Sequence, residues 1–235
     1  MSAYATSRTT LQHEVLAAVL QVRNGTLSVL LWRRALDPHI GRWSLPGGAL
    51  GRRENVETSI RRHLTEKVDL TQLNHVEELA VFSAPDRVPG PRMLATSFLG
   101  LVPSDAEPVV PADTTWHAVT ALPRTAFDHD DIIHHARDRL RAKLSYTNIG
   151  FALAPGKFTM STLRDLYAAA LGYRLSATNL QRVLSRRDVL QNTGETARPG
   201  TTGGRPATLY SFTRQRIRIT DPFAAFRPPE HDHSG

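Results

Sequence analysis

The sequence contains no cysteine among its 235 residues. This absence excludes disulfides, thiolate metal sites and a thiol nucleophile, and it fits a reducing intracellular compartment. The chain also has no apolar run near the roughly 18 residues that a membrane span needs, since Leu16–Leu20 is typical of the longest. A single Arg8 before a short apolar stretch broken by Gln21 is not a signal peptide. We therefore expect a cytoplasmic protein without a membrane partner.

The composition is otherwise that of a globular protein, with 40% hydrophobic and 22% charged residues. The net charge of +7 is unevenly placed: residues 1–144 hold 17 basic and 16 acidic residues, whereas residues 145–235 hold 12 and 6. This asymmetry favours a polyanion partner for the second half, although a merely solvated basic surface would carry the same charge. We expect two domains with different roles.

The first half has the pattern of strands around one helix. Apolar segments bounded by turn residues predict strands at Val15–Val22, Ser28–Arg34, Leu79–Ala84, Met93–Val102 and Trp116–Val119. The Asn24-Gly25 pair predicts a type I′ hairpin turn between the first two. Helical spacing predicts a helix over Glu57–Val68 and a long connecting helix that starts at Asp128.

The second half has a different pattern. Thr159 precedes a helical segment that Gly172 closes, and Ser176 or Thr178 can cap a second helix that runs to about Asp188. The segments Leu190–Asn192 and Thr208–Phe212 are expected to pair as strands. Two helices joined by a short turn and followed by a hairpin are the order of a winged helix-turn-helix.

The segment Gly48–Leu70 carries the most chemical information. Gly47-Gly48 allows a ligand to approach the backbone closely, and glycine turns before a helix can meet phosphates. Arg62 and Glu66 share a helix face, so Arg62 can hold a carboxylate while Glu66 points toward a cation or phosphate. Taken alone, a helix of mixed charge is more often a solvated surface.

This segment resembles the Nudix box, G-x5-E-x7-R-E-U-x-E-E-x-G-U, in which U is a bulky aliphatic residue. The spacing matches at Gly48, Glu54, Arg62, Leu64, Glu66 and Leu70, and Trp43-Ser44-Leu45-Pro46-Gly47-Gly48 resembles the usual lead-in. The resemblance implies an α/β fold, with an α/β/α sandwich around a mixed sheet. It also implies descent from enzymes that split diphosphate linkages with divalent ions held by the helix glutamates.

Three positions depart from the box. His63 and Lys67 stand where the family has glutamates, and Asp69 replaces the glycine. Because Mg²⁺ needs several oxygen ligands, these changes remove the electrostatic basis of metal-activated hydrolysis. A lysine can instead contact a ligand phosphate directly. We predict that the chain is not an enzyme, requires no cofactor or metal, and binds its ligand through Arg34, Gly47, Gly48, Glu54, Arg62, Glu66 and Lys67. Arg87 and Arg92 are further candidates, equally well explained as ordinary surface charges.

The exposed side of the second predicted helix suits base recognition, because Asn and Gln can contact adenine and Arg can contact guanine in the major groove. The alternative is a solvated amphipathic helix. The segment Gly203-Gly204-Arg205-Pro206 favours binding, because it places an arginine on a small, extended backbone suited to a narrow minor groove. The predicted DNA contacts are Thr178, Asn179, Gln181, Arg182, Arg186, Arg198 and Arg205.

A Nudix-like domain with an altered box, followed by a winged helix, resembles the Nudix-related transcriptional regulators of NAD metabolism (NrtR). The connector around Phe127 and the wing sequence Gly204-Arg205-Pro206-Ala207 also resemble that family. The resemblance implies a homodimer that represses NAD biosynthesis or salvage genes at an inverted-repeat operator and is released by ADP-ribose. We expect a sensing domain over 1–145, a DNA-binding domain over 146–220 and a mobile tail over 221–235.

Two other functions fit parts of the pattern. The chain can be an active ADP-ribose pyrophosphatase with an accessory nucleic-acid-binding domain. The metal would then need Glu66 together with further carboxylates, for which Glu54 is a candidate, and a turnover assay would decide. It can also be a module for RNA or a protein partner in which the Nudix part is a relic. The predicted wing has no aromatic array for stacking single-stranded bases, which counts against RNA.

Overall fold

A computed structural model describes residues 11–197 and 206–221. The expected tail beyond Asp221, the DNA contacts Arg198 and Arg205, and most of the predicted wing tip lie outside the described residues.

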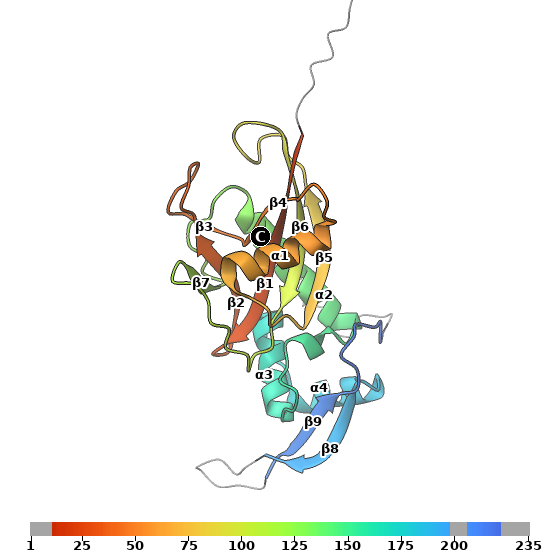
Figure 1. Cartoon of the computed structure of the whole chain (residues 1–235). Coiled ribbons are helices and arrows are strands. Elements are labelled where there is room, and N and C mark those ends of the chain that lie inside the picture. Colours follow the sequence, from red (N-terminus) through yellow and green to blue (C-terminus); the bar gives the residue numbers. More distant parts are fainter. Residues whose placement is uncertain (1–10, 198–205, 222–235) are drawn as a thin grey trace, which may run out of the picture.

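A mixed sheet forms the first half of the chain (Figure 1). Its strands are β1 (Gln12–Arg23), β2 (Thr26–Arg33), β3 (Trp43–Ser44), β4 (Gly47–Ala49), β5 (His75–Phe82), β6 (Met93–Leu101) and β7 (Thr114–Ala118). The order is β3-β2-β1-β6-β5, with β4 beside β1 and β7 beside β2. β1 and β6 are parallel, whereas β1 and β2 are antiparallel. Asn24 and Gly25 join β1 to β2 with φ of 48° and 73°, which confirms the predicted primed turn.

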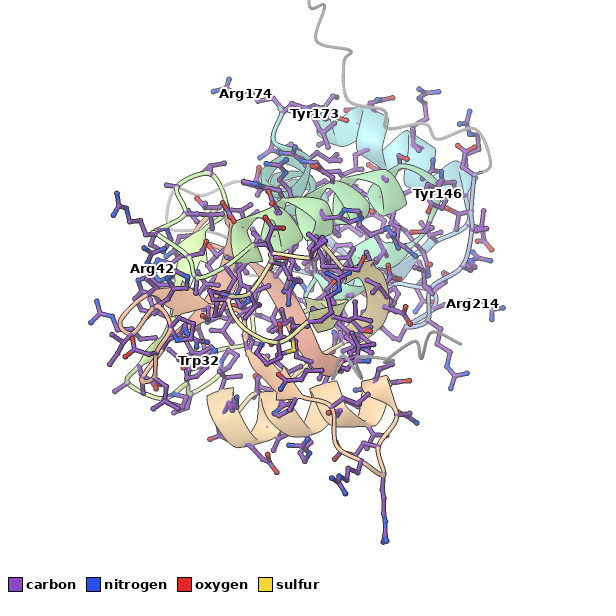
Figure 2. The ribbon with its side chains drawn as sticks, turned by 90° about the horizontal axis from the view of Figure 1, so that it is seen from above. Trp32, Arg42, Tyr146, Tyr173, Arg174 and Arg214 are labelled. Carbon is purple, nitrogen blue, oxygen red and sulfur yellow. The ribbon has the colours of Figure 1, made fainter. Side chains whose placement is uncertain are left out.

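The alternation of side chains along β1 separates two cores. Val15, Ala17 and Val19 pack with α1 (Val56–Val68), whereas Leu16, Ala18 and Leu20 pack with α2 (His129–Tyr146). In Figure 1, α1 (orange) lies in front of the sheet and α2 (green) behind it. Figure 2, turned by 90°, shows the same three layers from above. The predicted α/β/α sandwich is confirmed.

The second half contains the predicted winged helix. A 3₁₀ turn over Ile149–Ala152 leads to α3 (Met160–Leu171), α4 (Ala177–Arg186) and the hairpin of β8 (Leu190–Thr196) and β9 (Thr208–Phe212). The Thr159 and Ser176 hydroxyls cap the two helices by accepting hydrogen bonds from the backbone N–H groups of Thr162 and Asn179. Gly172 ends α3 in the left-handed region, as expected for a glycine C-cap.

The core behind the sheet continues into the winged helix. Leu140 and Leu144 on α2 belong to the same buried cluster as Leu163 on α3 and Leu184 on α4. The helix α2 therefore packs on the sheet and also supports the second half. Within the described residues, no helix combines the length and apolar character needed to cross a bilayer.

Three local expectations were wrong. Gly47 and Gly48 do not form a turn directly before α1, because they belong to β4 and pair with Leu16 and Val15 of β1. β5 begins four residues before the predicted Leu79, because an irregularity near Glu78 breaks the alternation that marks a strand. α4 ends at Arg186 rather than near Asp188, whose φ is 51°.

Candidate functional site

A cavity of about 310 Å³ opens where β1, β2, β4 and the two helices of the sandwich meet. Its wall contains four of the predicted ligand-binding residues, Arg34, Gly47, Gly48 and Lys67. The volume is at the lower end of the range for small-molecule sites, about 300–1,000 Å³. These four residues come from three separate segments of the chain, and the structure places them in one cavity.

Two cations face this cavity. The Arg34 guanidinium lies 4.8 Å from the ring centroid of Phe127, and its Nε donates a hydrogen bond to the Pro38 carbonyl at 3.0 Å. The Lys67 ammonium lies 5.1 Å from the Trp32 ring centroid. Over residues 11–197 and 206–221, neither cation has a carboxylate within ion-pair distance. Burial, and after it the nearby charge of Arg34, lowers the pKa of Lys67. An anionic ligand would relieve this repulsion.

The three remaining predicted residues lie just outside the cavity wall and bind one another. Arg62 donates to Glu54 at 2.6 and 2.8 Å and to Glu66 at 3.0 Å. The hydrogen bonds from Arg62 are the largest cause that lowers the pKa of Glu54, to about 2. Arg62 holds a carboxylate, as expected, but the expectation that Glu66 points toward a ligand cation or phosphate is not met, because the same guanidinium holds both carboxylates.

The two substituted box positions converge on β4. Lys67 Nζ donates a hydrogen bond to the Gly47 carbonyl at 2.6 Å, and His63 Nε2 donates to the Ala49 carbonyl at 3.0 Å. A Cβ at Gly48 would lie 2.7 Å from His63 Cε1 and 3.1 Å from Lys67 Nζ. Burial is the largest cause that lowers the pKa of His63, so its imidazole is neutral near pH 7 with the proton on Nε2.

These contacts do not fit the divalent cation that the Nudix resemblance implies. Glu54 and Glu66 are both bound to Arg62, and the substituted positions place an imidazole and an ammonium against β4. The described residues contain no cluster of three or more acidic or histidine side chains able to hold a metal ion. A hard cation such as Mg²⁺ needs several oxygen ligands.

Sequence reasoning missed several residues of the cavity wall, among them Glu14, Trp32, Ser44, Phe127 and His129. Ser44 and His129 are almost completely buried, and Ser44 Oγ and His129 Nε2 have no hydrogen-bond partner among the described residues. The backbone N–H of Leu45 donates to His129 Nδ1 at 2.9 Å, which fixes the neutral ring with its proton on Nε2. This wall therefore offers a buried donor and a buried hydroxyl to a ligand.

The interpretation of Arg87 as an ordinary surface charge was wrong. Its side chain is 1% exposed and is bonded to Glu14 at 2.6 Å and to Asp128 at 2.7 Å. Arg87 therefore holds Glu14 of the cavity wall without lining the cavity itself. Arg92 also lies outside the cavity wall and donates to the Ser83 carbonyl.

The helix α4 presents most of the predicted DNA-binding residues to solvent. Thr178, Asn179, Arg182 and Arg186 are exposed, whereas Leu180, Val183 and Leu184 are buried. Arg182 donates to Asn179 Oδ1 at 2.8 Å along the exposed face. Gln181 differs, because its amide nitrogen donates to the Tyr210 hydroxyl of β9 at 3.1 Å. That contact ties α4 to the wing.

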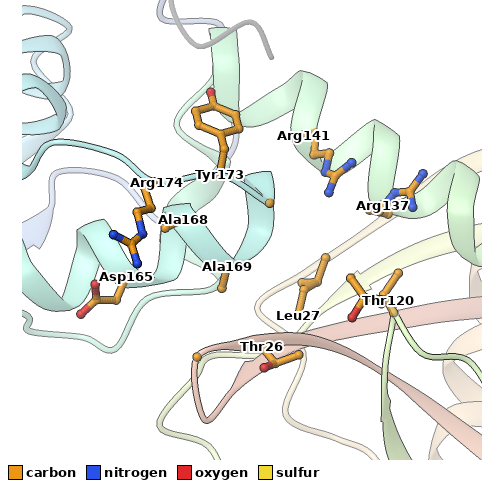
Figure 3. A pocket seen from close by; sticks show the side chains of 13 residues that line it. Thr26, Leu27, Thr120, Arg137, Arg141, Asp165, Ala168, Ala169, Tyr173 and Arg174 are labelled. Atoms are coloured by element: carbon orange, nitrogen blue, oxygen red, sulfur yellow. The ribbon is translucent and has the colours of Figure 1, made fainter. Parts of the chain in front are cut away.

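A second cavity, of about 520 Å³, lies where the sheet meets the winged helix (Figure 3). Arg137 and Arg141 enter its wall from α2, Leu27 from β2, and Ala169 from α3. Arg141 Nε donates to the Ala170 carbonyl near the end of α3 at 3.3 Å. On another side of the junction, Arg187 Nη2 donates to the Ser145 carbonyl of α2 at 2.6 Å. Both arginines connect α2 to the winged helix.

Comparison with known proteins agrees with this two-part architecture. Residues 12–136 match the NUDIX domain, and residues 150–212 match the NrtR DNA-binding winged helix domain. The ADPR responsive transcriptional repressor NtrR of Acinetobacter baylyi is 27% identical over 222 residues, which cover 92% of this chain and 87% of that protein.

Two solved structures match different extents of the chain. The crystal structure of Shewanella oneidensis NrtR complexed with a 27mer DNA has a TM-score of 0.72 and 28% identity, covering 85% of this chain and 92% of that one. The NUDIX domain of the same protein complexed with ADP ribose has a TM-score of 0.50 and 26% identity, covering 59% of this chain and 94% of that one. The chain belongs to the Nudix family and carries an NrtR-type winged-helix domain behind its Nudix domain.

Proposed function

We propose that this protein is a transcriptional repressor that binds operator DNA and is released from it by ADP-ribose. One observation carries the proposal. A cavity that contains two cations, neither paired with a carboxylate of the described residues, is connected through α2 to an exposed basic helix. Two relatives support the same combination, since one is an ADPR responsive transcriptional repressor and the other is complexed with DNA. We assign sensing to residues 1–145 and DNA binding to residues 146–220.

In this proposal, the cavity beside α1 holds the diphosphate of ADP-ribose. Arg34 and Lys67 supply positive charge, and Gly47 and Gly48 allow the ligand to approach β4. The cluster of Glu54, Arg62 and Glu66 borders this region and holds the start of α1 in place. The effector is the only small molecule the protein needs.

The DNA-binding surface is centred on the exposed side of α4. Arg182 and Arg186 are suited to guanine or phosphate, and Asn179 is suited to adenine. Gln181 contributes its carbonyl oxygen and its second amide hydrogen, since one amide hydrogen is bonded to Tyr210. The predicted contacts Thr178, Arg198 and Arg205 complete the proposed surface. We further propose a homodimer on an inverted repeat near NAD biosynthesis or salvage genes, acting in the cytoplasm.

The two sites are linked thermodynamically. If ADP-ribose binds more tightly to an arrangement that fits the operator poorly, DNA binding weakens by the same coupling free energy, typically about 1–3 kcal/mol. In a dimer, half-sites lie one or more DNA turns apart. A small change in the separation of the two α4 helices is therefore sufficient to weaken binding to the operator.

We also propose that the Nudix domain does not hydrolyse ADP-ribose. The ammonium of Lys67 and the imidazole of His63 occupy the positions from which helix carboxylates would hold an activating cation. Clear turnover of ADP-ribose with Mg²⁺ or Mn²⁺ would contradict this and favour an active pyrophosphatase.

The test is fluorescence anisotropy with duplex DNA from the protein's own upstream region and from NAD-biosynthesis promoters, at about physiological salt. We expect tight, sequence-dependent binding that added ADP-ribose reverses. Binding that ADP-ribose does not alter would contradict the proposed effector. Absence of specific binding to any duplex would contradict the repressor function.

A further inference from the structure

The cavity beside α1 already contains positive charge at the place where a Nudix hydrolase recruits metal. The Lys67 ammonium donates to the Gly47 carbonyl at 2.6 Å, and the position of this residue corresponds to the last glutamate of the Nudix box. His63, at the other substituted position, donates to the Ala49 carbonyl at 3.0 Å. Both side chains therefore bind carbonyl oxygens of the same short strand, β4.

The backbone at Gly48 permits this arrangement. A Cβ there would come within 2.7 Å of the His63 ring and 3.1 Å of the Lys67 ammonium. The two side chains thus approach the strand more closely than any residue with a side chain at position 48 would allow. Lys67 is consequently held at the cavity wall by a hydrogen bond and by the Trp32 ring.

Arg34 supplies a second positive charge in the same cavity. It is held on another side by the Phe127 ring and the Pro38 carbonyl. The combined charge of Arg34 and Lys67 equals that of one divalent cation. The acidic residue in the wall, Glu14, is already bonded to the buried Arg87 at 2.6 Å. The pair is therefore available to neutralise a ligand with two negative charges, as on a diphosphate.

We propose that Lys67 and Arg34 together replace the divalent cation, so that the pocket binds the diphosphate of a nucleotide ligand without any metal. This inference rests on the proposed function, because it uses the diphosphate of ADP-ribose as the ligand group. His63 acts as a positioning residue, since it holds β4 through the Ala49 carbonyl rather than by contacting the ligand. A metal ion at the same place would be repelled by the ammonium group.

The first test is calorimetric titration of the full chain with ADP-ribose, once in EDTA and once in millimolar Mg²⁺. The variant Lys67→Gln removes the proposed charge, and Arg61→Gln removes an equal charge from the outer side of the same helix, where Arg61 binds Glu57. We expect the wild-type affinity to agree within about twofold between the buffers. Lys67→Gln is expected to lose at least about tenfold, or about 1.4 kcal/mol, with Arg61→Gln unchanged.

A wild-type affinity that falls tenfold or more in EDTA would overturn the inference, as would a Lys67→Gln variant that binds like the wild type. Both results would leave ADP-ribose as the ligand and the proposed function intact. Absence of wild-type binding in both buffers would instead contradict the proposed function, and the inference would fail with it.

A second test reverses the substitution. The double variant His63→Glu and Lys67→Glu adds two carboxylates beside β4. We expect it to bind Mn²⁺, detected as loss of the free-ion signal in electron paramagnetic resonance, whereas the wild type does not bind the ion at this site. Retained DNA binding by the variant verifies that it is folded. Mn²⁺ binding by the wild type that ADP-ribose strengthens rather than displaces would overturn the inference.

Discussion

The buried guanidinium of Arg87 donates two hydrogen bonds to the Asp128 carboxylate, at 2.7 and 2.9 Å. Asp128 is the residue that precedes α2, and its carboxylate is directed to Arg87 rather than to the helix N-terminus. A third hydrogen bond, at 2.6 Å, joins Arg87 to Glu14 on β1. One side chain from the segment between β5 and β6 therefore fixes the start of α2 against the sheet, next to the ligand cavity.

Removal of this guanidinium should be strongly destabilising. We expect Arg87→Met to lower the free energy of unfolding by about 3–5 kcal/mol, because two carboxylates would remain without their buried partner. Urea denaturation at pH 7 measures the change. Arg61→Met breaks the exposed pair with Glu57 and should cost only about 0–1 kcal/mol. Similar losses of unfolding free energy in the two variants would show that the ion pairs of Arg87 contribute no more to stability than an exposed pair does.

His129 should make stability depend on pH. Burial lowers its pKa from 6.5 to about 3. Between these values the unfolded chain binds a proton that the folded chain does not, so the free energy of unfolding falls as the pH is lowered. For this one group the fall approaches about 1.4 kcal/mol per pH unit well below pH 6.5. Burial also lowers the pKa of His63 and His117, which adds to the effect.

The comparison of His129→Gln with the wild type isolates this contribution. The Gln carbonyl oxygen can still accept from the Leu45 N–H, but the side chain does not titrate. We expect a smaller loss of stability between pH 7 and pH 5 in urea denaturation. An unchanged pH dependence in His129→Gln would contradict the assignment.

Sequence patterns predicted those parts of the fold that local chemistry determines. The primed turn at Asn24-Gly25, the caps at Thr159 and Ser176, and the buried side of α4 depend on neighbouring residues, and each is present. The box spacing also located the helix that carries Lys67. Alternation failed at β5, where the irregularity near Glu78 shifts the register.

The rest of the site depends on contacts between distant segments. Trp32, Phe127 and His129 reach one cavity only because β2, β4 and the start of α2 meet there in the fold, and no local pattern encodes that meeting. The burial of Arg87 has the same origin, since its partners are 73 and 41 residues away in sequence. The sequence offers one signal for this part of the site, the aromatic Phe127 just before a predicted helix start.

The two glycines of β4 should respond differently to substitution. Gly47 has a φ of 154°, and a Cβ there would collide with the Val15 carbonyl of the neighbouring strand. We expect Gly47→Ala to lower the free energy of unfolding, because backbone of the sheet must move. At Gly48 the added Cβ would meet the ends of the His63 and Lys67 side chains, which can shift.

Gly48→Ala should therefore fold but bind ADP-ribose about tenfold or more weakly, since displacement of the Lys67 ammonium removes a charged contact of about 1.5–3 kcal/mol. Thermal unfolding and calorimetric titration of the two variants measure stability and affinity separately. Gly25→Ala is a control for left-handed strain alone, because nothing lies within 4 Å of its added Cβ. Normal ADP-ribose affinity in a folded Gly48→Ala variant would show that ligand binding does not require Lys67 to be held against β4.

Arg186 tests whether α4 is the recognition element. Its side chain is exposed near the end of the helix, and no ion pair within the described residues involves it. If Arg186 contacts a base edge, Arg186→Ala should relax the preference at one operator position by about 1–3 kcal/mol. If it contacts a phosphate, all duplexes should be bound more weakly and the salt slope should fall by about 1.

Arg164→Ala serves as the control, because it removes a charge from α3 that already pairs with Asp165. Anisotropy against an operator, its single-base variants and an unrelated duplex, at several salt concentrations, distinguishes these results. Equal binding by Arg186→Ala and the wild type on every duplex would exclude the exposed end of α4 from the interface.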